Sequence, residues 1–406
     1  MTILFLSPEI PYPPQSGHHL RTLNVLKILA RKHRIHFVGF AQNRKDYHYI
    51  PQIRPYCESV ALFPIAPKGY RPAFLRVALK NLFSRQPLVA QRYLTPEARR
   101  WIERLQNRHS FDLVHIDMLA LGLYRALFAH LPVFLTNHNV ESLRLYRWSR
   151  IEQQLVLRLY LRYQYRKLRR FEQEICPAMD RCIVVSETDR EHLQALCGGG
   201  RFSVVPNGVD TAYFKPVPIP QRPGHLIWVG GMGSPYNADA VDYFLAAIWP
   251  EISRRHPEVT AEFVGESPTP ALQRLAGTDP RIQLTGFVDD IRPLVSAATL
   301  FIAPLRSGSG TKVKVLNAMA QAKAVVATPV AAEGIEGVDG EHLAIAATPQ
   351  AFAAAVSALL ADTGRTLRMG AAARALIDAK YSWEVIGRTM DQLYTLSGPS
   401  AHQRTH

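Results

Sequence analysis

Two cations flank a loop of small residues in the second half of the chain. Arg306 precedes the loop and Lys312 follows it, and between them stand Ser307, Gly308, Ser309, Gly310 and Thr311. An apolar run of strand length, 299–305, comes before, and residues 312–322 carry apolar side chains at helical spacing. A glycine loop between a strand and a helix offers accessible N–H groups and the positive end of the helix dipole. We therefore expect a phosphate site here, although the glycines could merely tighten the turn.

A second loop of this kind follows the first apolar strand, residues 2–7. Four prolines between positions 8 and 17 exclude regular structure, and a helix with apolar residues at 20, 23, 26 and 29 comes next. Gly17 at the start of this helix is a candidate phosphate contact, with His18 and His19 beside it. Gly17 could equally be a simple helix cap, and histidines at such positions more often face solvent.

A polar cluster, Thr-Asn-His-Asn-Val-Glu, occupies positions 136–141 directly after the apolar strand 133–136. Strands and helices alternate up to this point, which predicts a parallel, doubly wound sheet. Such sheets bind ligands at the carboxyl ends of their strands. His138 and Asn139 are therefore candidate ligand contacts, with a structural role for the histidine as an equal alternative.

The chain has 406 residues, more than one hydrophobic core normally serves, so we expect two domains. Residues 215–223 contain four prolines and are predicted to link them. A second series of strands and helices opens with the strand 226–229 and with Gly230 and Gly231, and a helix is expected at 238–248. We expect domains at 1–210 and 211–382, a last helix at 383–396 and a disordered tail at 397–406.

The net charge of +15 lies entirely in the first half of the chain. Residues 1–210 hold 31 Lys and Arg against 16 Asp and Glu, whereas residues 211–406 hold 17 of each. Two basic segments with interleaved apolar residues stand out, 68–108 and 143–171, the second predicted as one long helix. Such segments suit an anionic membrane or a nucleic acid, and a solvated helix face is the plainer alternative.

Several classes of protein are disfavoured by composition. No window has the 18 apolar residues of a membrane span, and the apolar start lacks the basic flank of a signal peptide, so we expect a cytoplasmic protein. The four cysteines have no metal-binding spacing and are predicted to be free thiols.

Five segments carry a family resemblance. They are the glycine loop at 17, TNHNVES at 136–142, VVSETDRE at 184–191, VVPNGVDTAYF at 204–214 and the glycine loop with its helix and strand at 308–337. In their order and spacing they resemble the retaining GT-B glycosyltransferases of the large group-one family, particularly bacterial sugar transferases of exopolysaccharide clusters. The resemblance spans nearly the whole chain.

The resemblance implies an α/β fold of two Rossmann-like domains, with the acceptor on the first and the nucleotide-sugar on the second. The last helix would cross back onto the first domain. The implied activity is transfer of a sugar, with retention, from a nucleotide-sugar to a lipid-linked or saccharide acceptor in cell-surface polysaccharide or glycolipid synthesis. The basic domain would then dock on the inner face of the cell membrane, and no nucleic acid is expected as a partner.

The resemblance also assigns roles. Gly17 matches a contact to the donor phosphates, His138 a histidine close to the transferred sugar, and Arg306 and Lys312 the cations that stabilise the departing diphosphate. Since N–H groups and cations can meet that charge and no Asp-x-Asp pair occurs, we expect neither a metal nor another cofactor. Further donor contacts are expected at Gly230, Gly231, Ser309, Gly310 and Thr311, and acceptor-side candidates at His18, His19 and Asn139.

The chain departs from the family pattern in two places. Two glutamates eight residues apart are replaced by Ser309 and Asn317, so an amide stands where a carboxylate usually binds the ribose. The family's Arg and Lys pair is missing from residues 228–240, which contain no basic residue. Glu333 is the nearest carboxylate that could substitute, or it is a surface acid. These gaps leave a nucleotide-sugar epimerase of the same fold and a non-catalytic GT-B-like binding protein as alternatives.

Overall fold

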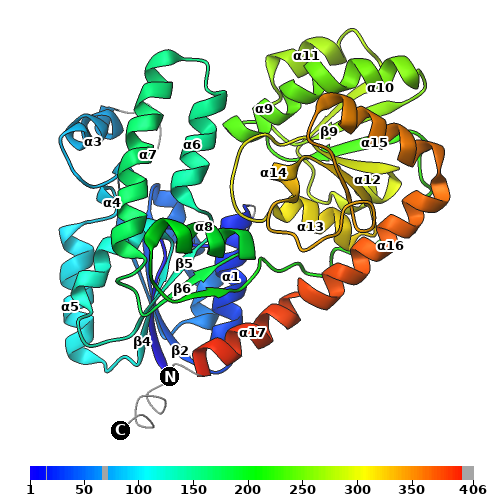
Figure 1. Cartoon of the computed structure of the whole chain (residues 1–406). Coiled ribbons are helices and arrows are strands. Elements are labelled where there is room, and N and C mark those ends of the chain that lie inside the picture. The colour runs from blue at the N-terminus through cyan, green and yellow to red at the C-terminus, as the bar shows by residue number, and fades with distance from the viewer. Residues whose placement is uncertain (15, 66–71, 396–406) are drawn as a thin grey trace. The chain divides into compact units, whose positions relative to one another are not determined.

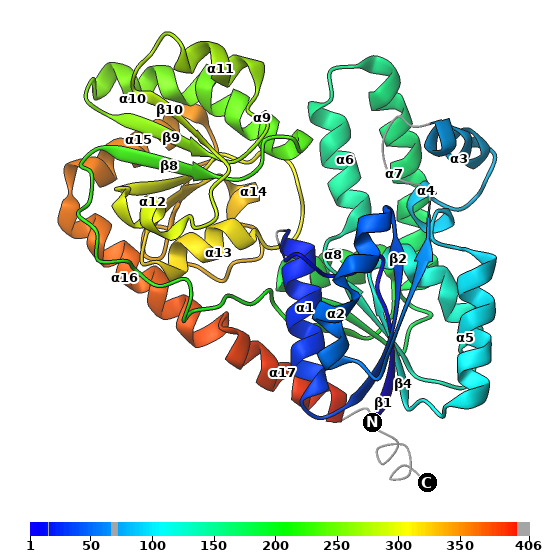
Figure 2. The same ribbon diagram turned by 180° about the vertical axis from the view of Figure 1, so that it is seen from behind.

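The computed structural model describes residues 1–14, 16–65 and 72–395. The chain forms two compact units (Figures 1 and 2). The first contains Met1–Tyr146, Leu155–Pro206 and the chain from Gly387 onward, and the second contains Arg147–Gln154 and Asn207–Ile386. The predicted tail at 397–406 lies outside the described residues.

The first unit is built on a seven-stranded parallel sheet in the order β3-β2-β1-β4-β5-β6-β7. Its strands are β1 (Thr2–Leu6), β2 (Arg34–Ala41), β3 (Ser59–Pro64), β4 (Leu113–Asp117), β5 (Val133–Asn137), β6 (Arg181–Val184) and β7 (Phe202–Val204). The central strands are apolar along their length and buried on both faces, as expected for a sheet covered by helices on both sides.

Helices cover this sheet and connect its strands. They are α1 (Gly17–Ala30), α2 (Ile50–Ile53), α3 (Pro72–Leu82), α4 (Leu88–Gln91), α5 (Pro96–Arg108), α6 (Glu141–Ile151), α7 (Leu155–Ile175), α8 (Glu187–Cys197) and the end of α17 (Trp383–Thr395). The C-terminal helix packs beside α1, where Asp391 accepts a hydrogen bond from Lys32 at 2.6 Å (Figure 2). The predicted return of the last helix to the first domain is therefore confirmed.

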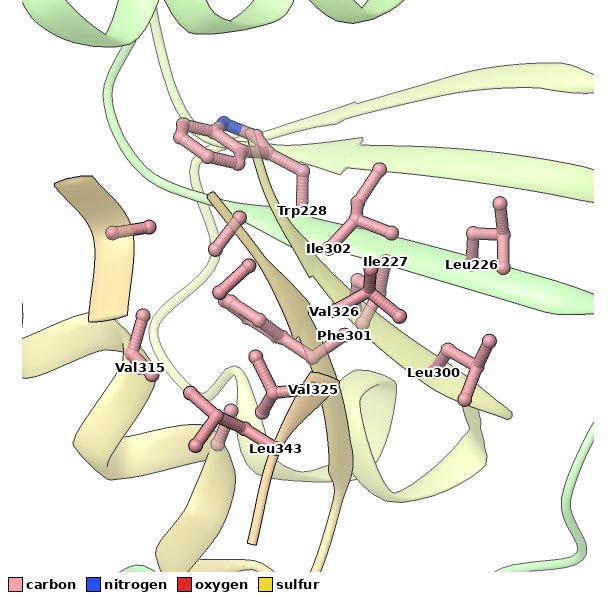
Figure 3. Close-up of a cluster of buried hydrophobic side chains, with 14 of the residues drawn as sticks. Leu226, Ile227, Trp228, Leu300, Phe301, Ile302, Val315, Val325, Val326 and Leu343 are labelled. Atoms are coloured by element: carbon pink, nitrogen blue, oxygen red, sulfur yellow. The ribbon is translucent and has the colours of Figure 1, made fainter. Parts of the chain in front are cut away.

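The second unit has a six-stranded parallel sheet in the order β10-β9-β8-β11-β12-β13. Its strands are β8 (His225–Val229), β9 (Thr260–Val264), β10 (Ile282–Gly286), β11 (Leu300–Ala303), β12 (Ala324–Ala327) and β13 (Ala344–Ile345). Figure 3 shows side chains of β8, β11 and β12 packed with Val315 in one apolar cluster, in which Trp228 is fully buried.

The helices of the second unit complete its layers. They are α9 (Pro235–Tyr243), α10 (Trp249–Arg255), α11 (Pro270–Ala276), α12 (Arg292–Ala297), α13 (Val313–Ala320), α14 (Pro329–Ala332), α15 (Pro349–Ala361) and α16 (Thr363–Lys380). With this unit, the predicted α/β class of two Rossmann-like domains is confirmed.

Three local predictions differ from the structure. The long helix expected at 143–171 is two helices, because residues 152–154 leave helical conformation and the backbone N–H of Gln154 bonds the carboxylate of Glu152 at 2.9 Å. The helix expected at 238–248 is α9 followed by a π-helical turn at Phe244–Ile248. The proline-rich segment 215–223 lies wholly within the second unit, where Val217 and Arg222 bond residues of α12.

Each sheet has one point where the strand order reverses. In the first unit it lies between β1 and β4, and in the second between β8 and β11. Loops that leave neighbouring strands there run to opposite faces of the sheet, which opens a crevice at the carboxyl ends of the strands. Both predicted phosphate loops start at these points, since one follows β1 and the other follows β11.

Candidate functional site

A buried aspartate organises the reversal point of the first sheet. Asp117 ends β4 and is 1% exposed. One carboxylate oxygen accepts a hydrogen bond from Nε2 of His138 at 2.7 Å, and the other accepts one from the hydroxyl of Thr22 at 2.6 Å. Burial alone would raise the pKa of Asp117, but the neighbouring His138 and His115 rings hold it well below its usual range. The ionised carboxylate therefore accepts the hydrogen bond from Nε2–H of His138 and holds the ring in one orientation, with Nδ1 outside this bond.

His18 faces His138 from the first turn of α1. The two ring centroids lie 4.8 Å apart, and both ring nitrogens of His18 are buried without a hydrogen-bond partner among the described residues. Burial, reinforced by His138, lowers the pKa of His18 to about 3, so the ring is neutral at pH 7. A neutral imidazole with unsatisfied nitrogens can bind a hydroxyl group.

His18, Asp117 and His138 are also the one group of described residues with ligand atoms close enough to hold a metal ion, all within 4.8 Å of one another. The carboxylate oxygens already accept the hydrogen bonds from His138 and Thr22, so the observed geometry is that of a hydrogen-bonded pair.

Two further candidates of the first unit are Gly17, which follows β1, and Asn139, which follows β5. Gly17 is the first helical residue of α1 and is exposed, while Ser16 is the cap, accepting a hydrogen bond from the N–H of His19 at 3.1 Å. Asn139 donates to Glu141 at 3.2 Å. The alternative that Gly17 is the helix cap is therefore wrong, while its phosphate contact stays a prediction.

A pocket of about 610 Å³ opens beside this site at the carboxyl ends of β1 and β2. Its polar lining is organised by Glu9, which accepts hydrogen bonds from His19 at 3.0 Å and from Gln42 at 2.6 Å. Two aromatic rings, Tyr12 and Tyr49, lie 5.6 Å apart in its wall. The volume is in the range of small-molecule sites, and rings beside hydroxyl-binding groups suit a saccharide.

The glycine loop of the second unit is buried, contrary to the accessible amides expected. Residues 307–311 are all buried, and the hydroxyl of Ser307 has no hydrogen-bond partner among the described residues. Gly308 and Gly310 have positive φ, +123° and +70°, and turn the chain back on itself. The loop thus presents few atoms to solvent but ends directly at the start of α13.

Lys312 occupies the N-cap position of α13, although its ammonium cannot accept a hydrogen bond from the helix. Its side chain makes no capping hydrogen bond to α13. Its ammonium bonds the carbonyl of Gly310 and lies 3.9 Å from the carboxylate of Glu333. An uncapped helix start with a cation at its positive end is unfavourable by itself and is relieved by an anion.

Two other candidates have ion-pair partners. Arg306 is bonded to Asp239 at 3.2 Å and lies over the ring of Tyr243. Glu333 accepts two hydrogen bonds from Arg147, at 2.6 and 2.9 Å, both residues belonging to the second unit. Their assignments as donor contacts therefore stay predictions.

The remaining donor candidates lie at the same end of the sheet. Gly230 and Gly231 follow β8, and Gly230 packs so closely against Gly265 that a Cβ on the latter would lie 2.3 Å from the carbonyl oxygen of Gly230. In the loop and helix, Ser309 and Thr311 are buried, and Oδ1 of Asn317 is buried without a partner among the described residues.

Sequence reasoning missed two residues of the site, Asp117 and Lys314. The first ends a strand next to His138's strand, so the rule that selected the histidine could have selected it as well. The second lies in the first turn of α13, and its ammonium reaches Asn237 Oδ1 at 2.9 Å, beside the end of β8. The pair of lysines at 312 and 314 was the signal available.

Both units match known protein families. Residues 16–213 match the family described as Glycosyltransferase Family 4, and residues 223–362 match Glycosyl transferases group 1. The chain belongs to the group-one, family 4 glycosyltransferases. It is therefore a retaining, metal-independent enzyme that uses a nucleotide-sugar donor.

Individual relatives of this glycosyltransferase are distant. A protein of Klebsiella pneumoniae described as "Uncharacterized 44.6 kDa protein in cps region" is 20% identical over 363 residues, 86% of this chain and 89% of the relative. Sucrose-phosphate synthase of Thermosynechococcus elongatus has the same fold, with a TM-score of 0.72 and 18% identity over 97% of this chain and 98% of its own. HepE of Anabaena in complex with UDP gives 0.67 and 18% over 97% and 100%.

Proposed function

We propose that this glycosyltransferase transfers a sugar from a nucleoside diphosphate donor to a lipid-linked or saccharide acceptor, for a cell-surface polysaccharide or glycolipid. The start of α13 carries the proposal, because its uncapped N-terminus and Lys312 form an anion site at the strand reversal of the second sheet. The description of a relative as a protein of a cps region supports a polysaccharide or glycolipid as the product. The complexes of HepE with UDP and with UDP-glucose favour a UDP-sugar donor.

The proposed mechanism rests on the charge of the leaving group. Departure of the nucleoside diphosphate builds negative charge on its oxygen atoms, and the N–H groups of α13 and the ammonium of Lys312 would stabilise that charge. Nδ1 of His138 would accept a hydroxyl proton of the transferred sugar as a hydrogen bond, held in place by Asp117. The acceptor sugar would occupy the pocket at Glu9, on the same unit as His138.

The test measures release of nucleoside diphosphate from UDP-, GDP- and dTDP-sugars, with and without membrane extract. Transfer that depends on the extract, and that Glu9→Gln weakens without changing the dissociation constant of UDP, supports the proposal. No turnover with any donor would overturn it. Conversion of the donor sugar without an acceptor would instead identify an epimerase.

The missing ribose carboxylate gives a further prediction. Asn317→Glu is expected to bind UDP about fivefold more tightly, since a charge-assisted hydrogen bond exceeds a neutral one by about 1 kcal/mol. Isothermal titration calorimetry measures the change, with Asn317→Ala as the matched variant expected to bind more weakly. Equal affinity in all three proteins would show that residue 317 does not reach the ribose.

We further propose that the enzyme works on an anionic membrane through an apolar tip of the first unit. The tip comprises exposed apolar residues at the end of α3 and the start of α7, namely Leu79, Leu82, Phe83, Leu155, Val156 and Leu159. The hydroxyl of Tyr163 donates to the carbonyl of Leu82 and so joins the two helices, which lie side by side in Figure 1. Arginines at 158, 162 and 166 follow along α7. This is the composition of a surface that inserts apolar groups between anionic headgroups.

In the described part of the chain no helix is long and apolar enough to cross a bilayer. Residues 68–71 of the basic segment lie outside the described residues.

Removing the two most exposed members should release the enzyme from vesicles. Phe83 is 95% exposed and Val156 81%. The double variant Phe83→Asp, Val156→Asp is expected to sediment at least about tenfold less with phosphatidylglycerol vesicles, because each buried side chain contributes about 1.5–3 kcal/mol. Leu367→Asp, at a leucine of α16 that is 57% exposed, is the control and should bind as the parent does. Unchanged binding of the double variant would remove the tip from the proposal.

A further inference from the structure

A second lysine at the start of α13, Lys314, has no ion-pair partner among the residues that the structure describes. The ammonium of Lys314 is 3.9 Å from the centroid of the Trp228 ring and donates to Oδ1 of Asn237 at 2.9 Å. It also fills the space beside Gly230, where a Cβ would lie 2.4 Å from the nitrogen. Among the described residues no carboxylate lies within 4.0 Å of it, whereas Arg306, which precedes the glycine loop, is paired with Asp239.

This arrangement is unfavourable for the folded chain alone. Burial, and then the neighbouring charge of Lys312, lowers the pKa of Lys314 to about 7. Both lysines also stand at the positive end of the α13 dipole, where a cation is repelled. A buried cation without a counter-charge costs stability unless a ligand supplies the negative charge.

The position of the Lys314 ammonium indicates which ligand it binds. The ammonium lies at the carboxyl end of β8, next to β11, where the order of the second sheet reverses and where such sheets bind phosphates. We propose that Lys314 binds the diphosphate of the donor together with Lys312, supplying from α13 the cation that residues 228–240 lack. This inference rests on the proposed function and names a contact that the donor site would otherwise be missing.

A second buried lysine provides the matched control. Lys323 is 3% exposed, and burial lowers its pKa to about 8. Its ammonium donates to the backbone carbonyls of Ser296 and Ala298, so its hydrogen bonds are made within the fold. Lys323 thus has a structural role, and Lys314 has the surroundings of a ligand-binding cation.

The experiment replaces each lysine by methionine and measures UDP affinity by calorimetry and the melting temperature of the ligand-free protein. Lys314→Met is expected to weaken UDP binding about 10- to 100-fold, as loss of a charge-assisted bond does. Its melting temperature should stay equal to that of the parent or rise, since an uncompensated charge has been removed. Lys323→Met should show the reverse pattern, with a lower melting temperature and unchanged affinity.

Proton uptake on UDP binding tests whether Lys314 acts through its charge. At pH 8 the ligand-free Lys314 is largely neutral and the diphosphate fully ionised, so UDP binding should take up close to one proton, which calorimetry in two buffers measures. The one charged group that acts on this ammonium among the described residues is Lys312. Proton uptake should vanish in Lys314→Met.

The outcomes are distinct. If Lys314→Met binds UDP as the parent does, or melts lower in the manner of Lys323→Met, the inference is wrong while the proposed function stands. If the parent binds none of UDP, GDP and dTDP, the proposed function fails as well.

Discussion

Lys312→Ala is expected to lower kcat about 100- to 1000-fold, the loss typical of removing one preorganised group that stabilises developing charge. The reason is its place at the uncapped start of α13, directly after the buried glycine loop. Affinity for the intact nucleotide-sugar should fall much less than kcat, because the charge on the diphosphate grows as the bond to the sugar breaks. Steady-state release of nucleoside diphosphate and calorimetry of the UDP-sugar in the absence of acceptor measure the two effects.

The control for this variant is Lys380→Ala, a solvent-exposed lysine of α16 that is ion-paired with Glu336. It should leave kcat and UDP affinity unchanged. If Lys312→Ala retains the parent kcat, the cation does not meet the leaving group. If the parent itself binds UDP tightly and transfers nothing, the chain is a binding protein of this fold.

His138→Ala is the second substitution with a large expected effect, a loss of about 100- to 1000-fold in kcat, within the range for removal of a positioned catalytic histidine. The buried hydrogen bond to Asp117 at 2.7 Å holds the ring in one orientation and tautomer. Since the residue lies in the first unit, the dissociation constant of UDP should stay close to that of the parent. Transfer rates and calorimetry separate the two quantities.

Asp117→Asn tests how the histidine is held. It should reduce kcat by about tenfold or more while leaving the ring in place, since the wrong tautomer is then permitted. Its stability effect has a defined pH range, because a depressed pKa stabilises the fold above the unfolded value near 3.9 and the contribution is lost as pH falls toward the folded value. The parent and the variant should therefore differ in melting temperature at pH 7, and the difference should shrink only as pH falls below about 4 toward the folded pKa. Full activity in either variant would place the chemistry elsewhere.

The sequence predicted the two sheets because their strands are short apolar runs at regular intervals, a local property. It predicted one helix at 143–171 because Glu152, Gln153 and Gln154 are good helix formers, and nothing local marks the break. The bond from the N–H of Gln154 to the carboxylate of Glu152, which accompanies the break, is known only from the structure.

The candidate site was predictable only where it is local. His138 and the Arg306 to Lys312 loop were found from residues that adjoin a strand end. The contact of Lys314 with Asn237 joins residues 77 positions apart, and the bond of Thr22 to Asp117 joins residues 95 apart. Spacing along the chain carries no information on such pairs, so the partners of these residues, and the burial of the glycine loop, required the structure.

The reversal of strand order in both sheets has a consequence for how substrate preference can diversify. Most candidate groups stand in a segment that follows a strand or in the helix that comes next, although Asp117 ends β4, and the strands contribute mainly apolar side chains to the two cores. A change of donor or acceptor can therefore be made by replacing a few short connections while the two apolar cores stay as they are.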